Sequence, residues 1–571
     1  MSLIREKPKK VDIKTNLVYT NASTSNGYFG NLRIRAMNHS FSHQVKFLKA
    51  NVFSFGQDAQ LLTESAFQQL SRRSIPKSML LDYQETLLSY ASHPGNKKIY
   101  EWAIHELKRI AKISRSLDRR SRQRYLNSGL PYSEFLSNFS HDFLRWLQKH
   151  AHCQIALHGD VTADLNQLLA LSLPSLEKYI TTAGYSNEEL WEQLGISEKH
   201  RLDFLLKEVS SLEAPSDVKD YLFEMLDLQV KLVPRNEKFS KPFNRLFTLP
   251  LFTFNECLKT FNYKRLWKIG VPVAETLSPL VRNKIAACIK TSMALTNRET
   301  DPITYMSEKE LQFYALERGV QVAIYPMKSE RQLPVESYVG YTVFRNGYPM
   351  AYGGAWVFGQ RANFGIHIFN EYRGGESGYI FCQLIRLYHQ LFKVSLFEIE
   401  PYQFGLDNSE GISSGAFWFY YRFGFRPVDA EMKKLATKEF NKRKTKGKYR
   451  HNKVLLKQFT SCNLELRLEK INHPSLATLS EKVTHIINTR YKGDRRNAIT
   501  AAIDKLQVKF PYRNLTPEQQ STFVDFGLLL HVLPGSYKAG IGKIIDQLVR
   551  WKGKNMFVYQ EHLLALLRSI Y

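Results

Sequence analysis

The sequence predicts an α+β protein in which a mixed-sheet domain is flanked by mainly helical regions. Apolar residues recur at three- and four-residue spacing over most of residues 56–300 and again over 454–571, which is typical of amphipathic helices. Between residues 320 and 428 the pattern changes to short runs rich in β-branched and aromatic residues, interrupted by two helical segments. Four strands, a helix, a strand, a helix and a strand indicate a mixed α/β unit.

The N-terminal region is expected to be helical after an irregular start. Residues 1–50 fit irregular chain or short strands, since residues 31–36 alternate in polarity. Ser186 and Glu189 form a capping box, in which a hydroxyl and a carboxylate satisfy free amides at a helix start. Helices are expected at 78–93, 97–124, 132–151 and 163–181, and another opens at 215–217.

The middle of the chain combines a further capping box with the strands. Ser307 and Glu310 predict a helix that ends at Gly319. Asn346 and Gly347 separate two strand-like runs and predict a hairpin, because both turn positions need positive φ. Strands are expected at 320–325, 338–344, 350–358, 362–369, 396–400 and 425–428, and helices at 378–392 and 415–423.

Three regions follow from these patterns: 1–300, mainly helical; 301–445, the α/β domain; and 446–571, helical again with a helix start at Thr516. Residues 432–453 contain ten Lys or Arg against one acid, Glu439. This basic run is either the helical end of the α/β domain or a charged linker.

Composition limits the class of protein. The chain has 571 residues, 80 Lys plus Arg against 53 Asp plus Glu, and a formal charge of +27. Apolar residues make up 43% and charged residues 23%, which excludes disorder of the whole chain and a fibrous repeat. The excess charge suggests a polyanionic partner such as nucleic acid, or an anionic membrane surface. Because every apolar run is far shorter than about 18 residues, no transmembrane helix is expected.

The cysteines indicate a reducing compartment. There are five, they lie far apart, and no CxxC occurs, so neither a zinc ribbon nor a disulfide framework is indicated. HExxH, GxxxxGK[ST] and GxGxxG motifs do not occur either, and no metal cofactor is expected. Reduced thiols in the cytoplasm are the simplest interpretation.

A basic stripe is a candidate contact with nucleic acid. Lys108, Lys112, Arg115, Arg119 and Arg122 are spaced by four, three, four and three residues, which on one helix places them on one face. The stripe fits either a solvated helix face or a surface that contacts phosphates. The basic run described above is the second candidate.

Two segments carry a chemical signal. Residues 371–378 read Glu-Tyr-Arg-Gly-Gly-Glu-Ser-Gly and lie between a strand and a helix. A glycine-rich turn there exposes backbone N–H groups at a helix N-terminus, which is what holding a pyrophosphate requires. Residues 416–427 read Ala-Phe-Trp-Phe-Tyr-Tyr-Arg-Phe-Gly-Phe-Arg-Pro. The candidate anion-binding residues are Arg373, Gly374, Gly375, Ser377 and Gly378.

Together these segments resemble the GNAT acyltransferase superfamily. Arg373 and Gly378 match the outer positions of its Arg/Gln-x-x-Gly-x-Gly/Ala motif. Tyr420, Gly424 and Phe425 match its Tyr-x-x-x-Gly-Phe motif. The resemblance implies that splayed fourth and fifth strands hold the pantetheine of an acyl-CoA, and that the glycine turn holds the pyrophosphate.

Over residues 320–430 the resemblance implies transfer of an acyl group from acyl-CoA to an amine. It implies that Tyr420 protonates the leaving thiolate, and a phenol with a pKa near 10 suits that role. His367 before the turn, and Glu398 or Glu400 after it, are candidates by position for the base that takes the amine proton. Each also fits a structural role, and Tyr420 fits a core aromatic.

The chain departs from the family pattern in three places. Glu376 stands where the family has its central glycine, and a carboxylate repels a pyrophosphate and blocks close backbone approach. The connection 403–415 is longer than usual, and Tyr325 and Tyr338 are too close for the family's two helices between its first strands. A second hypothesis is therefore a catalytically degenerate scaffold in a nucleic-acid-binding protein. The same fold also uses other donors, such as aminoacyl-tRNA.

Ser413 lies in a Gly411-to-Gly415 segment that fits the G-x-S-x-G pattern. A nucleophile elbow requires the serine directly on a strand-to-helix turn. Ser413 lies well beyond the strand expected at 396–400, so the pattern favours a loop over a hydrolase site.

Overall fold

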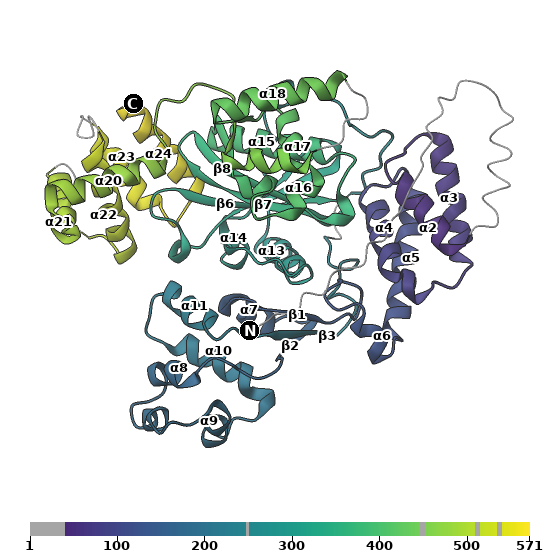
Figure 1. Cartoon of the computed structure of the whole chain (residues 1–571), viewed down its shortest axis with the longest axis horizontal. Helices are drawn as coiled ribbons and strands as arrows, with labels where there is room; N and C mark the ends of the chain where they lie inside the picture. Colours follow the sequence, from purple (N-terminus) through teal and green to yellow (C-terminus); the bar gives the residue numbers. More distant parts are fainter. Residues whose placement is uncertain (1–39, 247–249, 446–451, 509–513, 534–539) are drawn as a thin grey trace.

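The computed structural model describes residues 40–246, 250–445, 452–508, 514–533 and 540–571. A mixed eight-stranded sheet forms its centre, with helices on both faces and further helical groups at its sides (Figure 1). The α+β class predicted from the sequence is confirmed. The strand suggested for residues 31–36 lies outside the described residues.

The strands of the large sheet follow the order β10-β11-β9-β8-β7-β6-β5-β4. All neighbours pair antiparallel except β8 and β9, which pair parallel. Each strand predicted between residues 320 and 428 is present. The strands are β4 (Gln312–Ala315), β5 (Val320–Pro326), β6 (Ser337–Arg345), β7 (Tyr348–Phe358), β8 (Arg361–Ile368), β9 (Leu396–Ile399), β10 (Arg426–Pro427) and β11 (Leu464–Arg467).

The predicted hairpin between β6 and β7 is confirmed. Asn346 and Gly347 have φ angles of 47° and 82°, so the turn uses the left-handed region at both positions. The Asn346 side chain donates to the backbone oxygens of Ser92 and Phe252, which ties the turn to the end of a helix and to the irregular segment around Phe252.

Different helices cover the two faces of the sheet (Figure 1). On one face, Phe364 of β8 packs edge-on against Tyr388 of α15, with ring centroids 5.4 Å apart. We call this the α15 face and the other the α14 face. The α15 side carries α15 (Ser377–Phe392), α17 (Ala416–Arg422) and α18 (Ala430–Thr445), with α12 (Tyr263–Lys268) against α15 and α16 (Ser409–Ser414) before α17; the α14 side carries α13 (Pro279–Ala294) and α14 (Asp301–Thr304).

The N-terminal region is mainly helical, with a small sheet ordered β1-β3-β2. The capping box at Ser186 and Glu189 is confirmed. Its elements are α2 (Phe41–Asn51), α3 (Gln57–Ser71), α4 (Leu80–Ser92), α5 (Lys97–Arg115), α6 (Arg119–Gln123), β1 (Phe135–Ser137), α7 (His141–Gln148), β2 (Cys153–Leu157), α8 (Leu165–Ser172), α9 (Asn187–Gln193), α10 (Arg201–Ser211), α11 (Ser216–Glu224) and β3 (Val230–Pro234).

Several predicted helices are wrong in extent or type. Residues 41–51 form a helix rather than irregular chain, and 132–151 contains β1 before α7, because Phe135 pairs with Leu232 of β3. After Ser307 only a single turn forms at Glu308–Glu310. The helix expected to reach Gly319 is replaced by β4, whose pairing with β5 buries Phe313.

The C-terminal helices have a hydrophobic core of their own, which includes Phe523, Phe526 and Leu563. Before them, β11 enters the large sheet between β9 and β10. The regional boundaries near residues 300 and 445 stay predictions. β11 belongs to the large sheet although it lies after the predicted boundary at residue 445. The helices are α19 (Lys453–Gln458), α20 (Leu476–Tyr491), α21 (Arg495–Gln507), α22 (Pro517–Val532), α23 (Ile541–Trp551) and α24 (Met556–Ile570).

Among the described helices, none combines the length and apolarity needed to span a bilayer. The five cysteines are all described, and each is a free thiol. The described residues contain no group of three or more His, Cys, Asp or Glu side chains that could hold a metal ion.

Candidate functional site

The parallel strands β8 and β9 separate after a short pairing. Arg361, Ala362 and Asn363 face Leu396, Phe397 and Glu398, and β9 then ends at Ile399. β8 continues to Ile368, and residues 365–368 are partly exposed. The sheet therefore has a gap between β8 and β9, next to the start of α15.

Side chains from the turn after β9 (η9, Pro401–Phe404) lie across this gap. Asn363 donates to the Glu400 carboxylate from the opposite strand. A Cβ atom built on Gly365 would lie 3.0 Å from Nε2 of Gln403. The contact between Asn363 and Glu400 thus bridges the gap where the two strands part, and the Gln403 amide occupies it beside Gly365.

Tyr420 is placed on the α15 face. Its ring packs edge-on against Phe381 of α15 and against Phe425, and the residue is only 3% exposed. Burial raises the pKa of Tyr420 well above its ordinary value, so the phenol keeps its proton at neutral pH. The side chain is therefore a weaker acid than an ordinary tyrosine, and it fills a place in the aromatic core.

His367 and Glu398 belong to the α14 face, because Phe364 and Phe397 of the same strands meet each other on the α15 face. Burial lowers the pKa of His367 to about 4, with Arg298 and Arg373 acting in the same direction, so the ring is neutral and weakly basic at pH 7. Burial raises the pKa of Glu398, so this carboxylate holds a proton more readily than an exposed glutamate.

Glu398 lies at the last paired position before the gap, whereas His367 lies beside the Tyr352 ring near the end of β8. The Arg361 guanidinium is 3.8 Å from the Glu398 carboxylate. The structure therefore places His367 and Glu398 on the face opposite Tyr420, with Glu398 at the mouth of the gap. Glu400, the third candidate base, follows β9 and accepts from Asn363.

The glycine turn before α15 is closed by hydrogen bonds of its own. The Ser377 backbone and hydroxyl both donate to the Gly374 carbonyl, at 2.9 and 2.8 Å, and the Gly374 amide donates back to the hydroxyl. Within this described segment, the amides of Gly375, Glu376, Gly378 and Tyr379 have no acceptor, as is usual at a helix start. The turn thus has unpaired N–H groups, although Glu376, Gly378 and Tyr379 are buried and, of these four residues, only Gly375 is partly exposed.

Two aromatic rings cover the same turn. A Cβ atom on Gly375 would lie 2.5 Å from two ring carbons of Phe53, which follows α2. A Cβ atom on Gly378 would lie 2.5 Å from Cζ of Phe423. Glycine is required at these positions because aromatic rings approach the backbone closely, and the Phe53 ring stands where a phosphate would meet Gly375.

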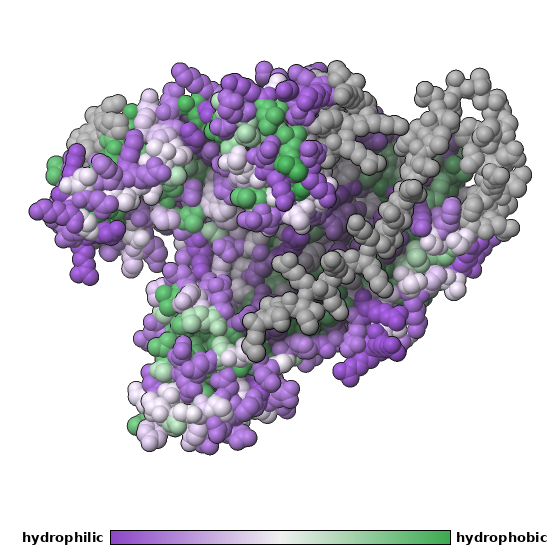
Figure 2. Space-filling view, viewed as in Figure 1, coloured by the Kyte–Doolittle hydropathy of each residue, from purple (hydrophilic) through white to green (hydrophobic). Residues whose placement is uncertain are grey.

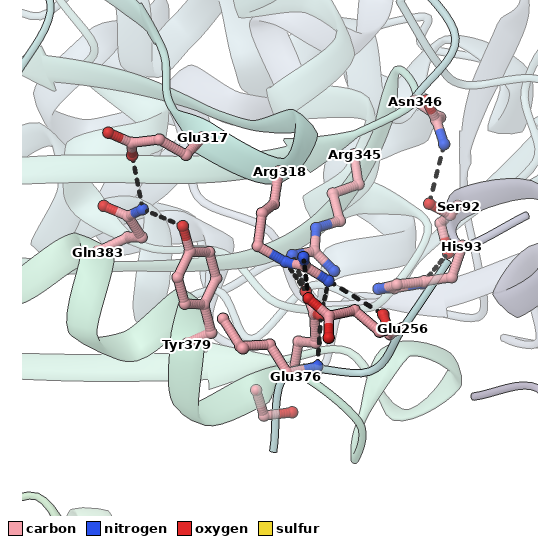
Figure 3. A network of polar contacts seen from close by, with 12 residues as sticks. Ser92, His93, Glu256, Glu317, Arg318, Arg345, Asn346, Glu376, Tyr379 and Gln383 are labelled. Atoms are coloured by element: carbon pink, nitrogen blue, oxygen red, sulfur yellow. Dashed lines mark hydrogen bonds and ion pairs between the residues drawn. The ribbon is translucent and has the colours of Figure 1, made fainter. Parts of the chain in front are cut away.

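Glu376 points into the protein and holds two arginines (Figure 3). Arg345 Nη2 lies 2.6 Å from one carboxylate oxygen, and Arg318 Nη2 lies 2.5 Å from the other. The Leu258 amide also donates to this carboxylate, at 2.9 Å. The repulsion between Glu376 and a pyrophosphate is therefore weaker than the sequence predicts, because two arginines neutralise the charge of this carboxylate inside the protein.

Burial alone would raise the pKa of Glu376, but Arg345, Arg318 and the Leu258 amide outweigh it, and the pKa is lowered. The Arg345 side chain is fully buried, and its guanidinium lies 4.9 Å from the centre of the Phe254 ring. Among the described residues, Nε and Nη1 of Arg345 have no hydrogen-bond partner. This buried arginine depends on Glu376 for its charge compensation.

Arg373 lies at the rim of the turn rather than above it. Its Nε donates to the Ile368 carbonyl at 2.8 Å, and its Nη1 forms an ion pair with Glu410 of α16. Of the five residues predicted to hold an anion, Arg373 and Gly374 are exposed, Gly375 and Ser377 are partly covered, and Gly378 is buried.

The basic stripe is divided between two helices. Lys108, Lys112 and Arg115 are exposed on α5, but the helix ends there, and Arg119 and Arg122 belong to α6. The single stripe predicted from spacing is therefore wrong, because Asp118 caps a new helix. Hydrophilic residues nevertheless gather over α6 (Figure 2). The first part of the basic run forms α18, and residues 446–451 lie outside the described residues.

Ser413 lies in α16, exposed, and its hydroxyl donates to the Glu410 carbonyl. It does not sit on a strand-to-helix turn, which agrees with the interpretation against a hydrolase site.

Sequence reasoning missed four residues of this site: Phe53, Arg318, Arg345 and Gln403. The carboxylate at position 376 was a signal that a buried partner is needed, but it does not identify which arginine. Nothing local in the sequence connects Phe53 with Gly375, because their contact depends on how the N-terminal helices pack on the sheet.

No known family, curated protein or solved structure matches this chain.

Proposed function

We propose that the protein is an N-acyltransferase that moves an acyl group from an activated donor, acyl-CoA or a related carrier, to an amine. The proposal rests on one observation above all: parallel β8 and β9 pair over only three positions and then part, beside a glycine turn and the start of α15. The strand and helix order from β5 to β10 agrees with the resemblance to the GNAT superfamily.

In the proposed reaction, the amine nitrogen attacks the acyl carbonyl carbon and the bond from that carbon to the donor sulfur breaks. Tyr420 gives its proton to the leaving thiolate on the α15 face, and a carboxylate takes the proton from the amine on the α14 face. Glu398 fits the second role better than His367, because it lies at the last paired position before the gap, whereas His367 lies beside the Tyr352 ring near the end of β8.

The turn before α15 is only partly suited to binding the phosphates of the donor. Four free amides and the exposed Arg373 favour an anion. The Phe53 ring occupies the space above Gly375, and Gln403 occupies the space beside Gly365. Binding of acyl-CoA therefore requires both side chains to move aside.

A turnover assay tests the proposal: release of free thiol from acetyl-CoA and longer acyl-CoAs, with a panel of primary amines. Tyr420→Phe is expected to lower kcat by about 10²- to 10⁴-fold, since it removes only the acidic proton. Tyr421→Phe is the matched control, because the neighbouring Tyr421 hydroxyl contacts Thr437 instead. Full turnover in Tyr420→Phe would refute the assigned acid, and absence of thiol release with every acyl-CoA would refute that donor.

The second candidate function is a non-catalytic scaffold that binds nucleic acid. It is favoured by the Phe53 ring, which covers the glycine turn at Gly375, where a phosphate of the donor would bind. The exposed Lys108, Lys112 and Arg115 would contact phosphates. This hypothesis predicts salt-sensitive binding of RNA or DNA and no thermal shift with acyl-CoA. For both candidates, the cytoplasmic location stays a prediction from the separated cysteines.

A further inference from the structure

A hollow of about 390 Å³ lies between the N-terminal region and the helices on the α14 face of the sheet. It is bounded by residues 138–140 before α7, by α11 and the turn after it, and by residues 299–305 around α14. These segments meet in Figure 1 below the large sheet. The volume is in the range of small-molecule sites.

Carboxylates dominate the polar lining of the hollow, whereas Phe139, Phe223, Leu228 and Tyr305 are buried beneath it. Of the residues that the structure describes, no lysine or arginine lines the hollow, although basic residues outnumber acidic ones by 80 to 53 in the whole chain. The acidic residues are Asp220, Glu224, Asp227, Glu299 and Asp301.

Within the described part of the chain, only Asp220 of these five carboxylates forms an ion pair with a basic side chain. Arg331 lies 2.6 Å from Asp220 and stacks on the Tyr305 ring at 3.9 Å, so it is already engaged. Among the described residues, the other four carboxylates form no ion pair within 4.0 Å. Glu299 is held by uncharged donors: the Ser140 amide at 2.9 Å, the Ser140 hydroxyl, and the Thr304 hydroxyl at 2.5 Å. Asp227 accepts from the Asn138 side-chain amide at 2.7 Å.

We infer that this hollow binds a protonated alkyl amine, either a free polyamine or a lysine side chain of a partner protein. Uncompensated carboxylates attract the ammonium groups, and the aromatic and leucine walls accept the methylene groups between them. A compact divalent metal fits less well, since these carboxylates do not converge into a metal-holding group. The inference concerns binding alone and does not depend on acyl transfer.

The neighbouring surface suits an amphipathic ligand. On α11, Val218 and Tyr221 are 42% and 63% exposed on the side away from the core. Apolar residues are visible around α11 in Figure 2. An alkyl amine that leaves the hollow would therefore meet apolar surface as well as charge.

Isothermal titration of the full chain tests the inference with two amines: spermidine, and the peptide acetyl-Gly-Lys-Gly-Lys-Gly-amide. Saturable binding of spermidine alone identifies a free polyamine, and saturable binding of the peptide alone identifies a partner's lysine. The uncharged 1,8-octanediol and MgCl₂ are the ligand controls, and neither should bind. If neither amine gives saturable heat, or if octanediol or Mg²⁺ binds as well as the amines, the inference is wrong.

Matched variants place the binding in the hollow. Asp301→Asn with Glu224→Gln removes two exposed lining charges and should weaken amine binding by about fivefold or more. Glu192→Gln with Glu198→Gln makes the same charge change at exposed positions outside the hollow and should alter binding by less than about twofold. Equal weakening by both pairs would overturn the inference. Because no acyl donor is present, this result is independent of the turnover assay.

Discussion

The glycine turn before α15 and the hollow beside α14 manage charge in opposite ways. At the turn, a glutamate that should hinder an anion is buried against Arg318 and Arg345. In the hollow, four carboxylates have no cation from the described protein around them. The first region completes its electrostatics internally, whereas the carboxylates of the second are left to solvent or, as we infer, to a bound amine. Ion pairing in three dimensions therefore separates a charge that the fold uses from charges that stay available to a ligand.

The largest expected effect on stability comes from removing the charge of Glu376, which pairs with Arg318 and Arg345 at the turn. Glu376→Gln keeps the shape but leaves Arg345 buried without a counter-charge, so the free energy of unfolding should fall by about 3–5 kcal/mol. Urea denaturation followed by circular dichroism measures this. The control Glu410→Gln removes the exposed partner of Arg373 and should cost less than about 1 kcal/mol. Similar losses in both variants would contradict the contrast.

A fall in pH should change the contributions of Glu376 at the turn and Glu299 in the hollow to the free energy of unfolding in opposite directions. The pKa of Glu376 is lowered in the folded state, so its stabilisation is present above its ordinary value of 4.5 and is lost as pH falls through the folded pKa. Burial raises the pKa of Glu299, so protonation there favours the folded state. Denaturation between about pH 6 and about pH 3 should show a smaller acid loss in Glu376→Gln than in the wild type. An unchanged slope would oppose this assignment.

Opening the turn is the next test. Phe53→Ala removes the ring above Gly375 and should strengthen binding of acetyl-CoA by about tenfold, which is about 1.4 kcal/mol. Titration calorimetry measures the affinity. Phe47→Ala is the matched control, since Phe47 is also a half-buried aromatic packed on the same core but does not cover the turn. If Phe53→Ala leaves the affinity unchanged, the ring is not what limits access.

The smallest effect concerns repulsion within the hollow. Asp301→Asn with Glu224→Gln should raise the free energy of unfolding by a few tenths of a kcal/mol at low salt, because like charges no longer face each other. The gain should vanish near 0.5 M NaCl, where the Debye length is only about 4 Å. Thermal denaturation at both salt concentrations measures it. A loss of stability at low salt would mean that the carboxylates are compensated after all.

The sequence anticipated the strands of the large sheet well, because alternation and the Asn346–Gly347 turn are local signals. It missed β11, since four residues of strand within a helical region carry little periodicity and depend on β9 and β10 for pairing. It also extended a helix from Ser307, where the capping pair exists but β4 gains more by pairing with β5.

For the candidate site, motifs located the turn and Tyr420 but not what surrounds them. The contacts of Gly375 with Phe53 and of Glu376 with Arg345 join segments far apart in the chain. Such contacts follow from packing of whole elements, so local spacing does not reveal them. The hollow was missed for the same reason, because its acids come from two segments that lie far apart in the chain.

The position of β11 has a consequence for synthesis on the ribosome. β9 and β10 both pair with β11, which is translated after them and after α18. While the chain grows, β9 therefore waits with an unpaired edge until Arg467 has left the exit tunnel, and such edges promote misassociation. The large sheet can close only late in translation, so a pause would favour correct folding only after enough further residues have been made to carry β11 out of the tunnel. A pause before that point would prolong the exposure of the β9 edge.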